Sequence, residues 1–530
     1  MGQLRVLLAE FCAWTTAHGI PHIGTTKRAC MRWLWLAIVV VFCCVLMHQC
    51  VSLILRFVEF DVAISTKIVS VERPFPVVTF CDTNPLPRHT VQPASELDDM
   101  LTAYRHSLER HFALDGEHNA SDSERFAAWH FDEYDSSTKK QLLAMEHLSM
   151  IMRDMKAQLV NTRTVDDFIL YYRFGQEEST SDSNDISAAF VPHYDPVFGV
   201  CYTFNKDASR RVTRGGIGMG LEVMLWTNAS EYIETTETIG ARFVLHLPGQ
   251  TPRPDTVGYS ATVGALTNFA IKTSVIERLP SPYSDCRLDD TFAGDRCWSE
   301  CSNEHVVKHC QCLSAKYEDE AGAELSSISK CAKEDAPCIL EHVYGVLTSS
   351  SSHEEHFDQF DCSCPPSCRI TAYDAIVTSA AWPALSHPVR ECVQLFANAT
   401  DQATDEFSSA YEACQQKYAD NSMLLNIFYE SIGQTEMKEY GIYVLASLLS
   451  DIGGQMGLWM GMSVLTMIEF LTFGVLLCVY GTKRARKKQT NETRSRPGDD
   501  DQTAPFDKIE MTETRQRPNS AISMMSLQQL

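Results

Sequence analysis

Two long apolar stretches constrain the fold of this chain more than any other feature. The first runs from Trp33 to Leu55 and the second from Tyr443 to Tyr480. Each can cross a hydrocarbon layer of roughly 30 Å, which takes about 20 helical residues. The first has too long an apolar core, and begins too far into the chain, for a cleaved signal peptide. The sequence therefore predicts two membrane helices with both chain ends on one side.

Basic residues set the orientation of the two helices. They precede the first stretch and follow the second, at Lys27, Arg28, Arg32, Lys483, Arg484, Arg486, Lys487 and Lys488. Short basic flanks stay in the cytoplasm, so we expect both termini to be cytoplasmic and the chain to span the plasma membrane twice. The predicted parts are a cytosolic segment (1–32), a first membrane helix (33–55), an extracellular domain (56–442), a second membrane helix (443–480) and a disordered cytosolic tail (481–530).

The predicted extracellular domain is acidic and rich in cysteine. The whole chain has a formal net charge of −23, although both predicted cytosolic segments are basic. An acidic loop attracts cations and argues against nucleic acid as a partner. Fourteen of the 20 cysteines lie in this domain, which allows up to seven disulfides in an oxidising compartment. The one-residue gaps of Cys310-Gln-Cys312 and Cys362-Ser-Cys364 do not fit a zinc site, so we expect no metal.

Local patterns in the same domain predict a mixed α+β fold. Alternating apolar residues over 56–80 and 200–276 predict strands separated by Gly-rich and Pro-rich turns. Segments 95–170 and 372–440 have the composition of helices, and the polar tail from 482 is typical of disorder. Three acceptor sequons predict N-glycosylation at Asn119, Asn228 and Asn398.

The second apolar stretch contains polar residues that a simple anchor would avoid. Asp451 and Glu469 lie within it, and ionisable groups are costly in a membrane helix unless they face water or partners. They therefore indicate a helix that lines an aqueous path, although Asp451 alone could also sit at the headgroup level. Gly453, Gly457 and Gly461 recur every four residues, a stripe that permits close helix packing.

The length of this stretch predicts a broken helix. Its 38 residues would reach about 57 Å as one helix, nearly twice the hydrocarbon thickness. Interrupted backbone is tolerated in a bilayer where it is buried in protein or lines water. Gly461-Met462-Ser463 is the natural place for the break, and its carbonyls and hydroxyl could replace part of the hydration shell of an ion.

The segment LLSDIGGQMGLWMGMSVLTMIEF resembles the pore segment of the degenerin/epithelial sodium channel/acid-sensing channel superfamily, whose selectivity filter has the pattern Gly/Ser-x-Ser. Further segments follow the order of that family. They are His18-Gly19, FPVVTFCDTNP at 75–85, GVCYTFN at 199–205 and a cysteine-rich block. The resemblance covers the whole chain except the tail.

This resemblance implies a trimeric channel, homomeric or built with related subunits, that is selective for sodium and blocked by amiloride. Its implied fold is a β-sheet core with helical thumb, finger and knuckle-like regions. The implied site residues are Gly461, Met462 and Ser463 (selectivity filter), Ser450, Asp451, Gly453, Gly454 and Gly457 (pore mouth and gate), Glu469 (lower pore) and His18 and Gly19 (cytosolic gating motif). No cofactor is implied besides the permeant sodium ion.

The family also implies a nested ladder of disulfides. The expected pairs are Cys81 with Cys201, Cys286 with Cys368, Cys297 with Cys364, Cys301 with Cys362, Cys310 with Cys338, Cys312 with Cys331, and Cys392 with Cys414. Tyr283 is either a contact that couples the thumb to a membrane helix or a structural tyrosine. Acid-sensing members usually carry a histidine just after the first span, and this chain has none there. Gating by protons, calcium, a peptide or mechanical force, and a constitutive leak, therefore all stay open.

Three other functions compete with this prediction. An ATP-gated purinergic receptor has the same topology but needs clustered basic residues for phosphate, whereas this loop is acidic. A pore-less two-span receptor leaves Asp451, Glu469 and the glycine stripe unexplained. An enzyme is not expected, because no hydrolase, zinc-protease or phosphate-loop motif is present.

Overall fold

The computed structural model describes residues 2–70, 72–112, 125–159, 162–180, 185–288, 294–316, 328–345, 362–384, 386–397 and 405–494. The chain forms two compact units. One consists of the residues up to Arg56 and those from Leu445 onward; the other, Phe57–Val444, is called the central domain here.

The first unit is helical. Its helices are α1 (Gly2–Trp14), α2 (Ile20–Thr25), α3 (Ala29–Val58, whose last residues belong to the central domain), α14 (Leu445–Met460) and α15 (Val464–Arg494). In the described residues, two helices are long and apolar enough to cross a membrane, Ala29–Val58 and Val464–Thr482. The predicted disorder of 481–494 is wrong, because α15 continues to Arg494 through a run rich in Lys and Arg, which are good helix formers. Residues 495–530 lie outside the described part.

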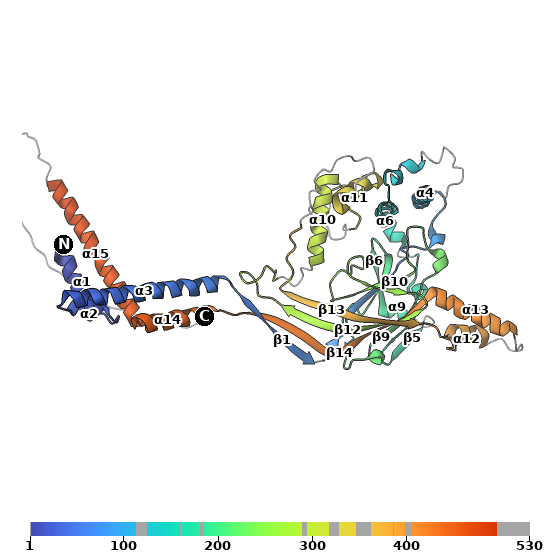
Figure 1. The fold of residues 1–530 in the computed structure, drawn as a ribbon. Helices are drawn as coiled ribbons and strands as arrows, with labels where there is room; N and C mark the ends of the chain where they lie inside the picture. Colours follow the sequence, from blue (N-terminus) through green and yellow to red (C-terminus); the bar gives the residue numbers. More distant parts are fainter. Residues whose placement is uncertain are drawn as a thin grey trace, which may run out of the picture. The chain divides into compact units, whose positions relative to one another are not determined.

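A seven-stranded sheet forms the largest part of the central domain (Figure 1). Its order is β13 (Arg369–Ala381), β12 (Ala265–Glu277), β14 (Ser422–Gly441), β9 (Leu221–Trp226), β4 (Ile169–Phe174) and β5 (Glu177–Thr180), and β1 (Val62–Ser70) also pairs with β14. The antiparallel register runs from Val62 opposite Gly441 to Ser70 opposite Gly433. The strand that leaves α3 is therefore hydrogen-bonded to the strand that leads into α14.

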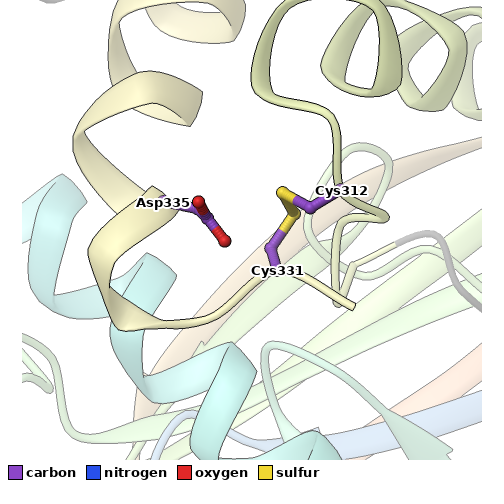
Figure 2. A group of neighbouring side chains, drawn as sticks. All are labelled: Cys312, Cys331 and Asp335. Carbon is purple, nitrogen blue, oxygen red and sulfur yellow. A yellow bond between two sulfur atoms is a disulfide. The ribbon is translucent and has the colours of Figure 1, made fainter. Parts of the chain in front are cut away.

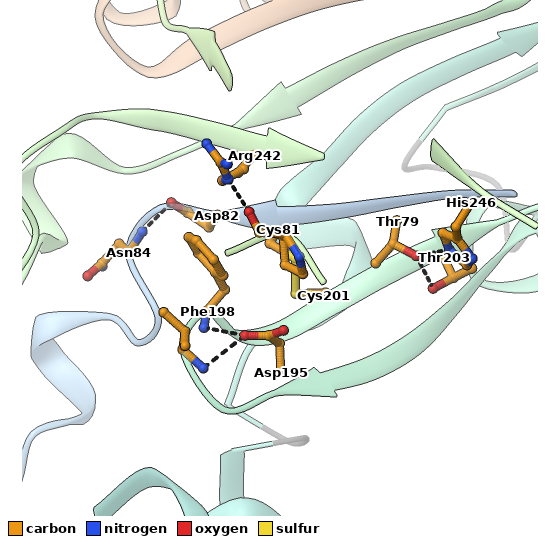
Figure 3. Close-up of a disulfide and its surroundings, with 12 residues drawn as sticks. Thr79, Cys81, Asp82, Asn84, Asp195, Phe198, Cys201, Thr203, Arg242 and His246 are labelled. Carbon is orange, nitrogen blue, oxygen red and sulfur yellow. Dashed lines mark hydrogen bonds between the residues drawn. A yellow bond between two sulfur atoms is a disulfide. The ribbon is translucent and has the colours of Figure 1, made fainter. Parts of the chain in front are cut away.

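A second sheet has five strands. Their order is β11 (Tyr259–Thr262), β10 (Gly240–His246), β3 (Val77–Asp82), β7 (Gly199–Phe204) and β6 (Phe190–Asp195), and a small pair joins β2 (Arg73–Pro74) to β8 (Arg211–Val212). Figure 3 shows the Cys81–Cys201 disulfide that joins the directly opposed residues of β3 and β7. The strands expected within 56–80 and 200–276 are confirmed.

Short helices complete the central domain. They are α4 (Glu96–His111), α6 (Ser137–Asp154), α7 (Lys156–Leu159), α8 (Val165–Phe168), α9 (Asp185–Ala189), α10 (Gly294–Cys310), α11 (Ala336–Tyr344), α12 (Arg390–Ala397) and α13 (Asp405–Asn421). Single 3-10 turns are η1 (Arg88–Thr90), η2 (Phe131–Glu133), η3 (Ile217–Met219), η4 (Ala229–Glu231) and η7 (Lys333–Asp335). Helices α4 and α6 pack together, and α11 contacts both α6 and α10.

The helical prediction for 372–440 is wrong at both ends. Residues up to Ala381 belong to β13, and those from Ser422 belong to β14. The start of β14 is buried on both faces, so its apolar run MLLNIFY does not alternate. Such a run cannot be distinguished from a buried helix by periodicity alone. Only the middle of the segment, α12 and α13, is helical.

The cysteines of the central domain pair as the family resemblance implied. The seven disulfides are Cys81–Cys201, Cys286–Cys368, Cys297–Cys364, Cys301–Cys362, Cys310–Cys338, Cys312–Cys331 and Cys392–Cys414. Figure 2 shows Asp335 beside Cys312 and Cys331. Because the two sulfurs are bonded to each other, they offer no thiolate to a metal. The Asp335 carboxylate accepts the backbone N–H of Ala332 at 2.9 Å and so caps a turn.

A buried histidine predicts acid-dependent stability of the central domain. His147 of α6 is fully buried, donates Nε2–H to the carbonyl of Trp129 at 3.1 Å, and meets the Trp129 and Phe131 rings edge-on. Burial lowers its pKa from 6.5 to about 4. Protonation therefore favours the unfolded chain. The contribution of His147 to the stability is complete above pH 6.5 and falls by about 3 kcal/mol as the pH drops to about 4.

Unfolding of the purified chain in detergent between pH 7.5 and 4 measures this effect. His147→Gln should reduce the pH dependence of the unfolding free energy, whatever its effect on stability at pH 7.5, while the similarly buried His246 keeps part of it. His387→Gln is the matched control, because His387 is exposed. Equal slopes in wild type and His147→Gln would contradict the prediction.

Candidate functional site

The second membrane segment is interrupted at three residues. Helix α14 ends at Met460 and α15 begins at Val464, so Gly461, Met462 and Ser463 lie between them. Gly461 has a φ of +59° and donates its N–H to the Gly457 carbonyl at 3.0 Å. A glycine in the left-handed region with this hydrogen bond is a common helix C-terminus. The local sequence thus ends α14 at the predicted place.

Ser463 restarts the helix on the other side of the break. Its N–H donates to Thr466 Oγ1 at 3.1 Å, and its own Oγ accepts the Thr466 N–H at 3.4 Å. This reciprocal pair resembles a capping box in which threonine takes the place of glutamate. The Ser463 side chain is exposed in the single chain, whereas Thr466 is fully buried. The hydroxyl predicted to face an ion therefore also caps α15.

The N-terminal segment contacts the break directly. His18 donates its backbone N–H to the Met460 carbonyl at 3.1 Å, and its Nδ1 lies 3.3 Å from the Gly461 carbonyl oxygen. Gly19 has a φ of +90°, and a Cβ there would lie 2.6 Å from Cγ2 of Val39 in α3. The His18-Gly19 motif and the break at 461–463 are therefore in contact. Gly19 occupies a position where a side chain cannot fit.

Glu469 of α15 binds the same N-terminal segment through hydrogen bonds. Its Oε2 accepts the Thr16 N–H at 2.8 Å, the Thr15 hydroxyl at 3.1 Å and the Thr16 hydroxyl at 3.3 Å. The Thr16 hydroxyl also lies 2.6 Å from that of Thr466. Sequence reasoning missed all three threonines, because nothing in their local pattern distinguishes them from ordinary polar residues.

An aromatic cluster adds apolar contact beside these hydrogen bonds. Phe11 of α1 is buried, stacks on Phe473 with ring centroids 4.1 Å apart, and meets Phe470 edge-on at 5.2 Å. On α14, the Trp459 indole N–H lies 3.0 Å from both Gln49 and Gln455. These contacts join α1 to α15 and α3 to α14, and they leave one face of α14 exposed.

That exposed face carries the remaining predicted residues of the second span. Ser450 and Asp451 are exposed, and a Cβ built at Gly453, Gly454 or Gly457 meets nothing described within 4 Å. The single chain thus leaves Gly453, Gly454 and Gly457 uncovered by its described residues. An uncovered small-residue face is suited to close approach by a neighbouring helix.

Tyr283 lies beside the segments of the central domain that adjoin α3 and α14 in the sequence. Its ring meets Phe60 edge-on at 5.4 Å, and a Cβ at Gly441 would lie 2.9 Å from Cε1 of Tyr283. Phe60 follows α3 and Gly441 ends β14. Tyr283 is half-buried and contacts the segments that follow α3 and precede α14, and its role in coupling stays a prediction.

Asn228 is exposed at the start of η4, where a glycan can be attached. Asn119 and Asn398 lie outside the described residues.

Two candidate membrane helices, a glycine-broken second segment and a disulfide-stapled domain between them are the features of a two-span channel subunit. Residues 11–473 match the family described as ASC, amiloride-sensitive sodium channel. The match extends over most of the chain, and the chain belongs to this family. It is a family of channels and not of enzymes, and the ATP-gated receptor alternative is wrong.

Named relatives agree with this assignment. Degenerin-like protein asic-2 of Caenorhabditis elegans is 25% identical over 504 residues, which cover 91% of this chain and 88% of that protein. Degenerin-like protein unc-105 of the same organism is 30% identical over 363 residues, which cover 65% of this chain and 38% of that protein. Degenerin mec-4 of Caenorhabditis briggsae is 32% identical over 300 residues, 54% of this chain and 36% of that protein. The chain spans less than half the length of the latter two.

Proposed function

We propose that this chain is a subunit of a sodium-selective, amiloride-sensitive cation channel of the plasma membrane, with both termini in the cytoplasm. Three copies, or copies mixed with related subunits, surround a pore lined by α14 and the start of α15. Gly461, Met462 and Ser463 form its filter, Ser450 and Asp451 its outer mouth and gate, and Glu469 its lower part. The central domain receives the stimulus.

The interruption of the second membrane segment carries this proposal. A continuous anchor helix has no reason to place a left-handed glycine and two further non-helical residues in an apolar stretch. Irregular backbone of this kind is stable in a bilayer only when protein or water covers it. The uncovered face at Gly453, Gly454 and Gly457 supports the proposal that a helix of a neighbouring subunit packs there. The exposed Asp451 supports the proposal of an aqueous pore mouth that attracts cations.

Replacing Ser463 by leucine tests the filter assignment. The larger apolar side chain removes the hydroxyl, obstructs a narrow ring and removes the cap on Thr466. We expect the preference for sodium over potassium to fall by about 1 kcal/mol, roughly a fivefold drop in permeability ratio. Reversal potentials in sodium and potassium solutions measure the ratio under voltage clamp, with amiloride to define the current.

Ser52→Leu is the control, because Ser52 is exposed on α3, a helix that crosses the same membrane. An unchanged sodium preference in Ser463→Leu would refute the filter assignment. A complete absence of current from a chain that reaches the cell surface would favour the pore-less receptor instead. Acid, peptide and membrane stretch applied in turn to the same cells identify the stimulus.

A further inference from the structure

Three histidines of the central domain gather between α10 and α11. His305 and His309 lie one turn apart on α10, and His342 lies on α11. The ring centroids are 4.5 Å apart for His305 and His309, 4.5 Å for His309 and His342, and 6.3 Å for His305 and His342. All three side chains are half-buried.

The separations of the ring centroids, though not the positions of the ring nitrogens, are close to those of a metal centre. Two histidines at positions i and i+4 on one helix face are a recurrent chelating pair. A zinc ion about 2.0–2.1 Å from three imidazole nitrogens, in tetrahedral directions, places the ring centroids roughly 5 Å apart. The three observed separations lie on either side of this value. His309 and His342 stack at 25° in the structure, so binding requires these rings to turn about χ2, which is a broad torsion in histidine.

Two further features favour metal binding by these three histidines. His305 hydrogen-bonds through its ring to the backbone carbonyl of His342. Ligating histidines commonly donate their second ring N–H to such an acceptor, which fixes the tautomer and leaves the other nitrogen for the ion. The Cys310–Cys338 disulfide, next to His309, joins α10 to α11. The two helices that carry the three histidines are thus joined before any ion arrives, and only the rings have to turn.

We propose that His305, His309 and His342 form a binding site for a divalent transition-metal ion of the zinc type, with its fourth position open to water. Imidazole donors suit zinc, copper and nickel, whereas calcium and magnesium require oxygen ligands. The site is separate from the 461–463 break and from the disulfide-bonded group of Cys312, Cys331 and Asp335. A bound ion would join α10 to α11 a second time, beside the disulfide.

Zinc titration of the purified full-length chain in detergent tests the site by calorimetry. Six cysteines of the chain are not in disulfides, so the decisive quantity is the difference between wild type and the triple variant His305→Gln, His309→Gln and His342→Gln. We expect the triple variant to bind one zinc ion fewer per chain, and each single variant to weaken that site at least about tenfold. His387→Gln, at an exposed position, should bind as wild type does.

The single variants guard against misfolding, because each alters one half-buried side chain and leaves the seven disulfides in place. Equal zinc stoichiometry and affinity in wild type and the triple variant would overturn the proposal. So would saturation of the site by calcium at the same concentrations.

The effect on current rests on the proposed function. Extracellular zinc should change the sodium current of wild type and leave that of the triple variant unchanged. Cells without current would overturn the channel proposal and leave the calorimetric result standing. Normal current together with no histidine-dependent zinc binding would overturn the metal site alone.

Discussion

Gly461→Ala is expected to abolish most of the sodium current. Gly461 has a φ of +59°, a region that costs a residue with a Cβ about 1–2 kcal/mol. A Cβ there would also lie 1.8 Å from Nδ1 of His18. Alanine has no side-chain rotamers, so it cannot relieve this clash by itself. The backbone of the break or the His18 ring must move, and both form the contact between the N-terminal segment and the proposed filter. We expect whole-cell current to fall at least about tenfold at equal surface expression.

Two comparisons separate the causes of that loss. Gly474→Ala is the matched control, because Gly474 lies in α15 and a Cβ there meets nothing described within 4 Å. In a His18→Ala background the clash is absent and only the backbone strain remains. The further loss caused by Gly461→Ala should therefore be smaller in that background. Wild-type current from Gly461→Ala at the surface would show that the break does not adopt this conformation when the channel conducts.

Features with local causes could be predicted from the sequence. The first span is a long apolar run, and α3 contains it entirely. The break at 461–463 has a local cause as well, since a glycine that follows a helical run ends a helix by its own conformational freedom. The disulfide pairs came from the family resemblance and not from spacing, because fourteen cysteines alone allow a very large number of pairings.

Features that depend on distant partners could not be predicted. His18 and Gly461 are 443 positions apart, and neither sequence motif indicates that the other lies beside it. The threonines that bind Glu469 are equally distant, at Thr15 and Thr16. The misassigned strand β14 has a tertiary cause too: its first residues are buried on both faces of the sheet, which removes the alternation that identifies a strand.

Glu469 has a second role that the sequence did not indicate. An acid in a membrane helix was interpreted as a pore-lining charge, and the same carboxylate holds the N-terminal segment through three hydrogen bonds. That segment carries His18, which contacts the Gly461 carbonyl. The described contacts thus run from Glu469 through residues 15–18 to the proposed filter. The two roles predict different outcomes when the partners of the carboxylate are removed.

Glu469→Ala is expected to reduce the sodium current roughly tenfold, because hydrogen bonds to a charged acceptor contribute about 1.5–3 kcal/mol each. Thr16→Val removes one hydroxyl donor and its contact with Thr466, and should reduce the current by a smaller factor. Glu469→Gln keeps an acceptor oxygen without the charge, so its sodium current should lie between those of wild type and Glu469→Ala. Surface-normalised current under voltage clamp measures all three variants.

The double variant Thr16→Val with Glu469→Ala decides between anchoring and pore lining. If Glu469 acts by anchoring the N-terminal segment, Thr16→Val should cost much less current in the Glu469→Ala background than in wild type, because its partner is already gone. If Glu469 acts only as a charge facing permeant sodium, the two losses should multiply, and single-channel conductance rather than open probability should fall. Multiplicative losses would therefore reject the anchoring role and leave Glu469 as a pore residue alone.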